Sequence, residues 1–232
     1  SNLLTDWKAL ALFPVIFVGE QCLALVSSLN AYCFTLRSRS LNNVLFQAVM
    51  IPASLLISAL FDTQRIKSRR NRGILGIAFT GIVTMASCAG LLGWMKQHGF
   101  ESRAGKPPGV DWTDPRYAGG LVLYLFWGVV YASYQICTQW VLASLTNDPV
   151  KCAVYSGYFK GTTSLGLCAA FLMDAYNVSY VNQLIIEFVL YGVGISLLIF
   201  VNWFYVRDTN YFAEENVVAL TYIEKAIDEK VT

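Results

Sequence analysis

Charged side chains are scarce in this chain of 232 residues: Asp, Glu, Lys and Arg make up 14% of it, whereas 56% of its residues are hydrophobic. A soluble domain carries about 25% charged residues, and a core of this size could not bury so much apolar surface. The formal net charge is only +2, and no basic face runs along the chain, which argues against a nucleic-acid partner. We therefore expect lipid to be the solvent of most side chains.

Histidine is nearly absent, since His98 is the single one. One imidazole excludes HExxH zinc sites and haem held by two histidines. The chain also lacks a Gly-rich phosphate loop, a nucleophile with a histidine partner and an Asp/Glu–His cluster at metal-binding spacing. We therefore expect no enzymatic activity, no bound metal and no cofactor.

The six cysteines have no CxxC spacing among them. All but Cys152, which lies at the edge of one run, are inside long apolar stretches, where a thiol behaves as a small hydrophobe. We expect free structural thiols, with a disulfide framework or a metal site as the alternatives.

Long apolar runs, by contrast, are plentiful. A helix needs roughly 20 apolar residues to cross the hydrocarbon core, and six stretches qualify: Leu10–Leu36, Leu41–Phe61, Gly73–Met95, Ala118–Leu145, Val154–Met173 and Val181–Val206. Three of them contain no charged residue, and all are too long for barrel strands. The sequence predicts an all-α, polytopic membrane domain of six transmembrane helices over residues 1–208, with Pro52 as a tolerated kink.

The basic residues predict the orientation of these helices, because Lys and Arg are retained on the cytoplasmic side. The segment from Asp62 to Arg72 carries five basic residues against one acid; the basic ones are Arg65, Lys67, Arg69, Arg70 and Arg72. The loop from Lys96 to Tyr117 is mixed in charge. We expect the basic loop and both termini in the cytoplasm and the mixed loop outside. Arg37 and Arg39 then lie outside, which is a weaker contrary signal.

Residues 209–232 differ in composition from the rest of the chain. Apolar residues recur there at helical spacing and are separated by acidic ones; the apolar residues are Val217, Leu220, Ile223, Ile227 and Val231. We expect a cytoplasmic amphipathic helix. Its acidic face favours a protein contact over attachment to anionic lipid.

Glu20 is the most informative single residue, because a charge in mid-span costs on the order of 3 kcal/mol. Its helical neighbours Ala24, Ser27 and Ala31 are small or polar, which suits a tight helix contact or a wet cavity. Three interpretations stay open: a structural carboxyl, a site for substrate, proton or ion, and exposure to locally thinned lipid.

Lys160 lies between Gly157 and Gly161, which form a GxxxG pattern typical of helix packing. At 1.5 Å per residue, Glu20 lies about 15 Å and Lys160 about 9 Å from the cytoplasmic ends of their spans, and a lysine side chain could bridge that difference. We predict that the two side chains pair across adjacent helices. The alternative is that Lys160 extends to the cytoplasmic surface.

The fourth span carries aromatic and amide side chains spaced by three or four residues. Tyr131, Gln135 and Gln139 are the candidates for binding a substrate, because buried amides in lipid require partners or water. Ordinary helix packing is the alternative interpretation of this stripe. Glu187, in the last span, is expected near the external boundary as an interfacial residue.

Four short motifs carry a resemblance to a known family: Trp7-Lys8-Ala9-Leu10, Ser40-Leu41-Asn42-Asn43, Tyr155-Ser156-Gly157-Tyr158-Phe159-Lys160-Gly161 and Asp174-Ala175. From about residue 7 to residue 208 the chain resembles the C-terminal half of fungal Unc-93-like members of the major facilitator superfamily. It departs from the fungal pattern at Gly19-Glu20-Gln21-Cys22-Leu23, where that pattern is aromatic and rich in Asn.

The resemblance implies spans seven to twelve of a twelve-helix protein, built as a 3+3 inverted repeat, with substrate bound between two halves. No sequence echo of the repeat links residues 7–95 with 118–206. The first, second, fourth and fifth spans would face the cavity or the missing N-terminal half. The first eight residues lack a signal peptide and an initiator methionine, and we expect the chain to be a piece of a longer protein.

Three functional hypotheses follow. The first is half of a transporter that moves a small solute or ion by alternating access, with the lipid bilayer, the N-terminal half and an unidentified substrate as partners. The second is a non-transporting membrane scaffold that regulates or escorts a channel or receptor. The third is a six-span protein that dimerises to rebuild two halves.

Overall fold

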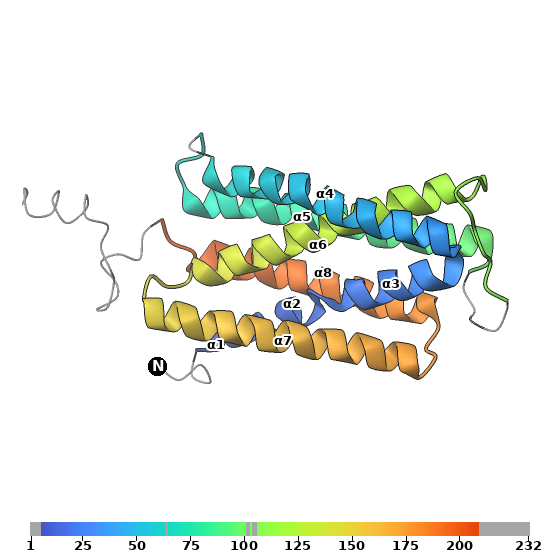
Figure 1. The fold of residues 1–232 in the computed structure, drawn as a ribbon. Coiled ribbons are helices and arrows are strands. Elements are labelled where there is room, and N and C mark those ends of the chain that lie inside the picture. The colour runs from blue at the N-terminus through green and yellow to red at the C-terminus, as the bar shows by residue number, and fades with distance from the viewer. Residues whose placement is uncertain (1–5, 64, 101–102, 104–105, 209–232) are drawn as a thin grey trace, which may run out of the picture.

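The computed structural model describes residues 6–63, 65–100, 103 and 106–208, and its elements in that part of the chain are eight helices (Figure 1). The helices are α1 (Trp7–Ala11), α2 (Phe13–Val18), α3 (Gln21–Cys33), α4 (Leu36–Asp62), α5 (Arg69–His98), α6 (Tyr117–Ala143), α7 (Pro149–Ala175) and α8 (Tyr180–Tyr205). A single isolated bridge joins Phe34 to Val110. The expected tail helix over 209–232 lies outside the described residues.

The first predicted span is the one that differs from expectation, because a continuous helix over Leu10–Leu36 is wrong. The chain breaks at Leu12 and again at Gly19–Glu20, which separates α1, α2 and α3. Pro14 lies in the first turn of α2, where its missing N–H removes a bond that a continuous helix would need. At the second break Glu20 adopts φ −109° and ψ −3°, outside the ideal helical range.

The other five predicted spans each correspond to one helix: α4, α5 and α7 extend a few residues beyond the predicted bounds, and α6 and α8 match theirs to within two residues. Pro52 lies inside α4 without ending it. Five segments are long and apolar enough to cross a membrane: Phe13–Cys33, Leu36–Asp62, Arg69–His98, Tyr117–Ala143 and Tyr180–Tyr205. The 27-residue α7 is equally long but less apolar. Its place as a sixth span therefore stays a prediction.

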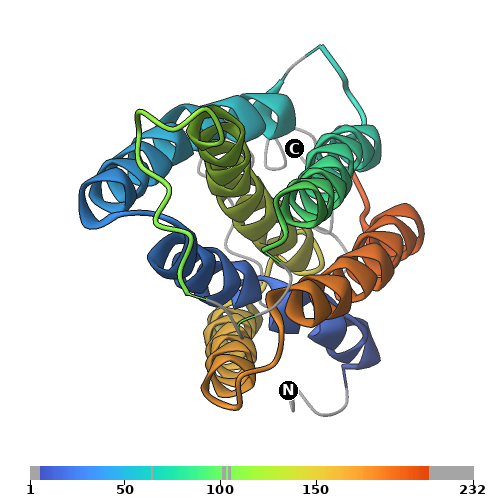
Figure 2. The same cartoon turned by 90° about the vertical axis from the view of Figure 1, so that its right-hand side faces the viewer.

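The helices form an elongated bundle in which α4 and α5 lie on one side and α7 lies on the opposite side (Figures 1 and 2). Helix α6 packs against both α4 and α5, and α8 packs against α5 and α2. Helix α7 packs against α2 and α3. The side chains of Trp127, Tyr134 and Tyr191 are among the largest that are fully buried in the bundle interior.

The two ends of the bundle collect different parts of the chain. The start of α1, the basic loop before α5 and the end of α8 lie at one end, and the 99–116 loop lies at the other (Figure 1). The rings of Trp7 and Tyr205 are 5.0 Å apart, and Asp208 accepts a hydrogen bond from the backbone N–H of Arg69 at 2.7 Å. The side of the membrane to which each end belongs stays a prediction.

Candidate functional site

The break between α2 and α3 is held by side chains of α6. The Gln135 amide donates to the carbonyl of Gly19 at 3.2 Å, and the Tyr134 hydroxyl donates to the carbonyl of Val15 at 3.2 Å. A carbonyl freed by a helix break is costly in an apolar surrounding unless it finds a donor. The two polar residues of α6 supply those donors, so the break is a built feature of the fold.

Glu20 lies at this break and contacts Lys160 of α7. The Nζ atom of Lys160 is 3.3 Å from Oε1 of Glu20, so the predicted contact between the two side chains is present. The Glu20 side chain is 12% exposed and that of Lys160 is 67% exposed. An ion pair with one partner so accessible contributes little to stability, on the order of 1 kcal/mol or less. Because the Lys160 side chain is exposed, a molecule that approaches α7 from outside the bundle could reach the Glu20 carboxylate beside it.

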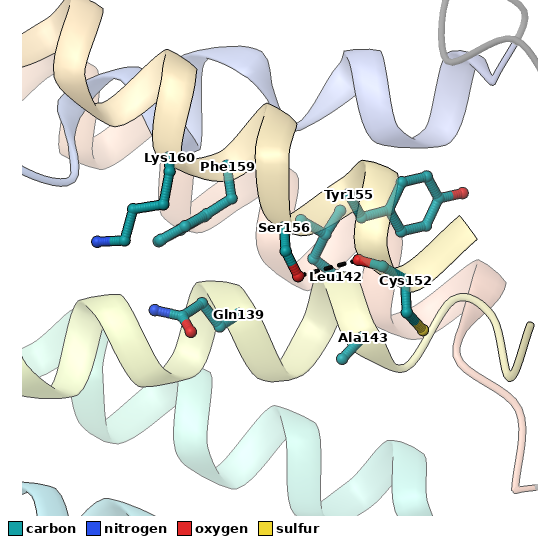
Figure 3. Close-up of a pocket in the computed structure, with 8 residues that line it drawn as sticks. All are labelled: Gln139, Leu142, Ala143, Cys152, Tyr155, Ser156, Phe159 and Lys160. Carbon is teal, nitrogen blue, oxygen red and sulfur yellow. Dashed lines mark hydrogen bonds between the residues drawn. The ribbon is translucent and has the colours of Figure 1, made fainter. Parts of the chain in front are cut away.

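A groove of about 260 Å³ runs from Lys160 along the interface of α6 and α7 (Figure 3). Figure 3 shows the Lys160 ammonium and the Gln139 amide at the same end of the groove. Its lining residues are Gln139, Leu142, Ala143, Cys152, Tyr155, Ser156, Phe159 and Lys160. Sites for small molecules usually enclose 300–1,000 Å³. The groove is slightly smaller than that range, so the described residues of α6 and α7 do not by themselves enclose a site of the usual size.

Tyr131, Gln135 and Gln139 take different positions relative to the Glu20–Lys160 pair. Tyr131 is close enough to Glu20 for the two to interact electrostatically. Gln135 is nearly buried and holds the helix break, whereas Gln139 lines the groove. The fold thus gathers all the predicted binding residues around one helix break. Their role in binding a substrate or ion stays a prediction.

The predicted packing glycines do not contact a neighbouring helix among the described residues. A Cβ added at Gly157 or Gly161 would meet nothing within 4 Å. The close approach occurs instead at Gly166, where an added Cβ would lie 1.7 Å from the carbonyl oxygen of Phe17 on α2. The GxxxG spacing therefore marks an open face of α7, and helix packing there stays a prediction for a surface outside this chain.

The expectation that Glu187 is interfacial is wrong. Glu187 is fully buried, and it lies on the inward stripe of α8 with Gln183 and Tyr191. Lipid-facing positions of α8 are as apolar as inward ones, so hydropathy alone does not reveal which face of the helix turns inward. The polar residues Gln183, Glu187 and Asn202 recur with roughly helical spacing, and that spacing is the signal that could have placed Glu187 inside.

Sequence reasoning also missed a polar network between α3, α4 and α6. The Asn42 amide donates to Oδ1 of Asn30 at 2.9 Å, and the Asn30 amide donates to Oδ1 of Asn43 at 3.0 Å. The hydroxyls of Tyr117 and Tyr124 donate to Asn42 and Asn43 at 2.8 and 2.7 Å. Buried amides and hydroxyls that satisfy one another fix the relative register of helices. The pair Asn42-Asn43 at the start of a span was the available signal.

The two ends of the bundle treat their basic residues differently. At the 99–116 end each of three arginines has an acidic partner in the described structure: Arg37 pairs with Asp111, Arg103 with Asp174 and Arg116 with Asp114. Hydrogen bonds from Arg116 lower the pKa of Asp114 to about 2. The pairing of Arg37 with an acid reduces its weight as a contrary topological signal.

In the basic loop, the side chains of 65–72 form no salt bridge with another described residue. Arg69 lies 5.7 Å from the ring centre of Trp140, and Arg70 lies 5.6 Å from that of Trp203. Asp62 is the last residue of α4, and Arg65 and Lys67 are exposed. Among the described residues, Asp208 lies beside this loop and accepts a hydrogen bond from the backbone N–H of Arg69.

These features define a polytopic α-helical membrane protein with a polar helix break inside the bundle. Comparison with known proteins gives the family. The chain is 41% identical over 184 residues to an uncharacterized membrane protein of Schizosaccharomyces pombe, which aligns 79% of this chain with 37% of that protein. It is 31% identical over 212 residues to UNC93-like protein 1 of Arabidopsis thaliana, covering 90% and 46% of the two chains.

A further relative is a UNC93-like protein of Schizosaccharomyces pombe, 32% identical over 186 residues, with 78% of this chain and 36% of that protein aligned. The chain belongs to the UNC93-like membrane proteins. It spans less than half the length of these relatives. No family model matches the chain, and no solved structure matches it.

Proposed function

We propose that the chain is one half of a membrane transporter of the major facilitator type, which moves a small solute or ion by alternating access without catalysing a reaction. The observation that carries this proposal is the Glu20–Lys160 pair, held 3.3 Å apart at a helix break. Charged residues in spanning helices are rare and mark pathways for substrates, ions or protons. The groove beside Lys160 has one wall, and the longer relatives have room for the other.

In this proposal the pair works by exchange of partners. Glu20 binds a proton or a cation, and Lys160 is then free to bind an anionic group of the solute. Gln139 and Tyr131 contact the solute from α6, and Gln135 keeps the carbonyl of Gly19 satisfied while α3 moves. The six-span half that the longer relatives contain would close the groove and rock against this one.

The test uses the full-length protein in liposomes that contain a pH-sensitive dye, with a panel of amino acids, sugars, nucleosides and inorganic ions as solutes. We expect Glu20→Gln and Lys160→Ala to lower pH-dependent uptake by at least tenfold, while Lys160→Arg retains part of it because the cation remains. Lys106→Ala, a change at an exposed loop lysine, is the control. Full uptake by both Glu20→Gln and Lys160→Ala would contradict the proposal.

A scaffold function is the second candidate, and one observation favours it. The open face of α7 at Gly157 and Gly161 has nothing packed on it among the described residues, and such a face suits a protein partner. If deletion of 209–232 removes the cellular phenotype while Glu20→Gln and Lys160→Ala leave it intact, the scaffold function is correct and transport is not.

A further inference from the structure

A second acidic residue is buried deeper than Glu20. Glu187 is the eighth residue of α8, about 10 Å along the helix at 1.5 Å per residue, and none of its surface is exposed. Neither carboxylate oxygen has a hydrogen-bond partner among the described residues. An ionised carboxylate in that position would be both dry and unpaired, which is the most costly state of the group.

Among the described residues, no Lys, Arg or His forms a salt bridge with Glu187. Helix α8 packs against α2, α3, α5 and α6, and α2 carries no titratable side chain. The titratable neighbours of Glu187 are Cys22 of α3, Cys88 of α5 and Tyr191 of its own helix. From α6, the ring of Tyr134 lies 4.9 Å from that of Tyr191. These neighbours are ordinarily uncharged at neutral pH, and a bound proton would neutralise Glu187 without any further partner.

Glu187 is also linked to the helix break. Cys22, whose thiol lies near the carboxyl group of Glu187, also lies near that of Glu20. Cys22 is in the first turn of α3, two residues after Glu20. A movement of α3 at the break would therefore displace Cys22 and change the cover over Glu187. The buried Glu187 carboxyl and the accessible Glu20–Lys160 pair are thus both close to the break between α2 and α3.

We propose that Glu187 is a proton-binding site, occupied in this conformation, and that release of its proton is coupled to solute movement in addition to the exchange at Glu20 and Lys160. The coupling rests on the transport function proposed above. When α3 moves, the O–H bond of the Glu187 carboxyl breaks, the proton passes to a water molecule admitted beside α3, and Glu187 keeps the electron pair as a carboxylate. Return of α3 requires a new proton, because the closed site cannot hold the anion.

Infrared spectroscopy of the full-length protein in lipid near pH 7 tests the occupancy. We expect a deuterium-sensitive C=O stretch of a protonated carboxylic acid, which Glu187→Gln removes and the matched Glu20→Gln leaves in place. Glu187→Met serves as a second variant that also lacks the band, and it should fold because a neutral, unpartnered acid is replaced by an apolar side chain of similar volume. A spectrum unchanged in both Glu187 variants overturns the proposal.

The same liposomes as above test the coupling, with uptake driven by an imposed pH gradient. We expect Glu187→Gln to lower gradient-driven uptake at least tenfold while exchange of solute without a gradient continues. Unchanged gradient dependence in Glu187→Gln overturns the coupling. If the wild-type protein moves no solute but the infrared band is present, the transport function and the coupling fail, and the bound proton stands.

Discussion

Two glutamates of the same bundle meet burial in opposite ways. Glu20 lies beside a lysine whose side chain is 67% exposed, whereas Glu187 has no hydrogen-bond partner in the described structure. The first carboxylate has a cation within 3.3 Å, whereas the second, in the proposal above, carries a proton. Pairing with an accessible cation and binding a proton are thus two ways in which this bundle accommodates an acidic residue.

Asp111 stabilises the end of the bundle opposite the basic loop. Its carboxylate accepts from Nε of Arg37 at 2.9 Å and from the hydroxyls of Thr35 and Ser38 at 2.8 and 3.0 Å. These hydrogen bonds, that of Arg37 above all, hold the pKa of Asp111 well below its ordinary value. The backbone of Val110 bonds on either side with Cys33 and Thr35, so the loop is attached to the turn between α3 and α4.

We expect this attachment to depend on pH. Since the folded state lowers the pKa of Asp111, its stabilising contribution is fully present above the unfolded value of about 4 and is lost as pH falls through the folded value. Thermal unfolding in detergent from pH 7 to about pH 2 should show this loss begin below about pH 4 in the wild-type protein. Asp111→Asn should unfold earlier at pH 7 and lose less on acidification.

Asp62→Asn is the matched control for Asp111→Asn, because the Asp62 carboxylate forms no salt bridge within the described residues. Equal acid sensitivity in Asp111→Asn and in the wild-type protein would show that Asp111 does not stabilise the loop through its charge.

At the scale of single helices, α2 and α7 make a close contact just before the break between α2 and α3. Gly166 allows the backbone of Phe17 to approach α7 more closely than any side chain would permit. The approach brings Glu20, three residues further along, to the level of Lys160. Two glycines of one helix thus serve different purposes, since Gly166 makes a contact and Gly161 leaves a face open.

We predict that Gly166→Ala lowers the free energy of unfolding by about 1–3 kcal/mol, because backbone must move to admit the added carbon. Gly161→Ala meets open space and should be neutral or slightly stabilising, as alanine favours helix over glycine by up to about 1 kcal/mol. Unfolding of both variants in mixed micelles measures the difference.

Equal effects of Gly166→Ala and Gly161→Ala in the isolated chain would contradict the predicted packing of α2 on α7. A loss for Gly161→Ala that occurs only in the full-length protein would locate the expected GxxxG contact on a surface outside this chain.

Across the whole molecule, the distribution of charge separates the two ends of the bundle. Arginines near the 99–116 loop have acidic partners, whereas the basic loop at the other end has none among the described residues. Unpaired basic residues favour the cytoplasmic face. We therefore expect the basic loop, the start of α1 and the end of α8 to be cytoplasmic.

Labelling in sealed vesicles with the cytoplasmic face inward tests this orientation. We expect a membrane-impermeant maleimide to label Lys106→Cys directly and Lys67→Cys only after permeabilisation; both positions are exposed lysines. Cys152 and Cys168 are replaced by serine in the background, because the other four thiols are buried. The reverse labelling pattern would invert the topology.

Much of the architecture was predictable from the sequence, since apolar run length is a local and additive property. The helices that correspond to five of the six predicted spans, the all-helical fold and the contact of Glu20 with Lys160 follow from run lengths and from the rare charges in them. The breaks within the first span were missed because Gly19 and Pro14 are compatible with a spanning helix. The second break also depends on hydrogen-bond donors from α6, which the sequence of the first span does not reveal.

The sequence by itself determined that lipid surrounds most of the chain, where the long apolar segments lie and which charged residues are unfavourable in lipid. Tertiary structure decided which side of each helix turns inward, and with it the burial of Glu187, the close contact at Gly166 and the network around Asn30. The physical reason is that lipid chains and the interior of the helix bundle are equally apolar. Hydropathy therefore says almost nothing about which side of a helix faces the bundle, and packing decides it.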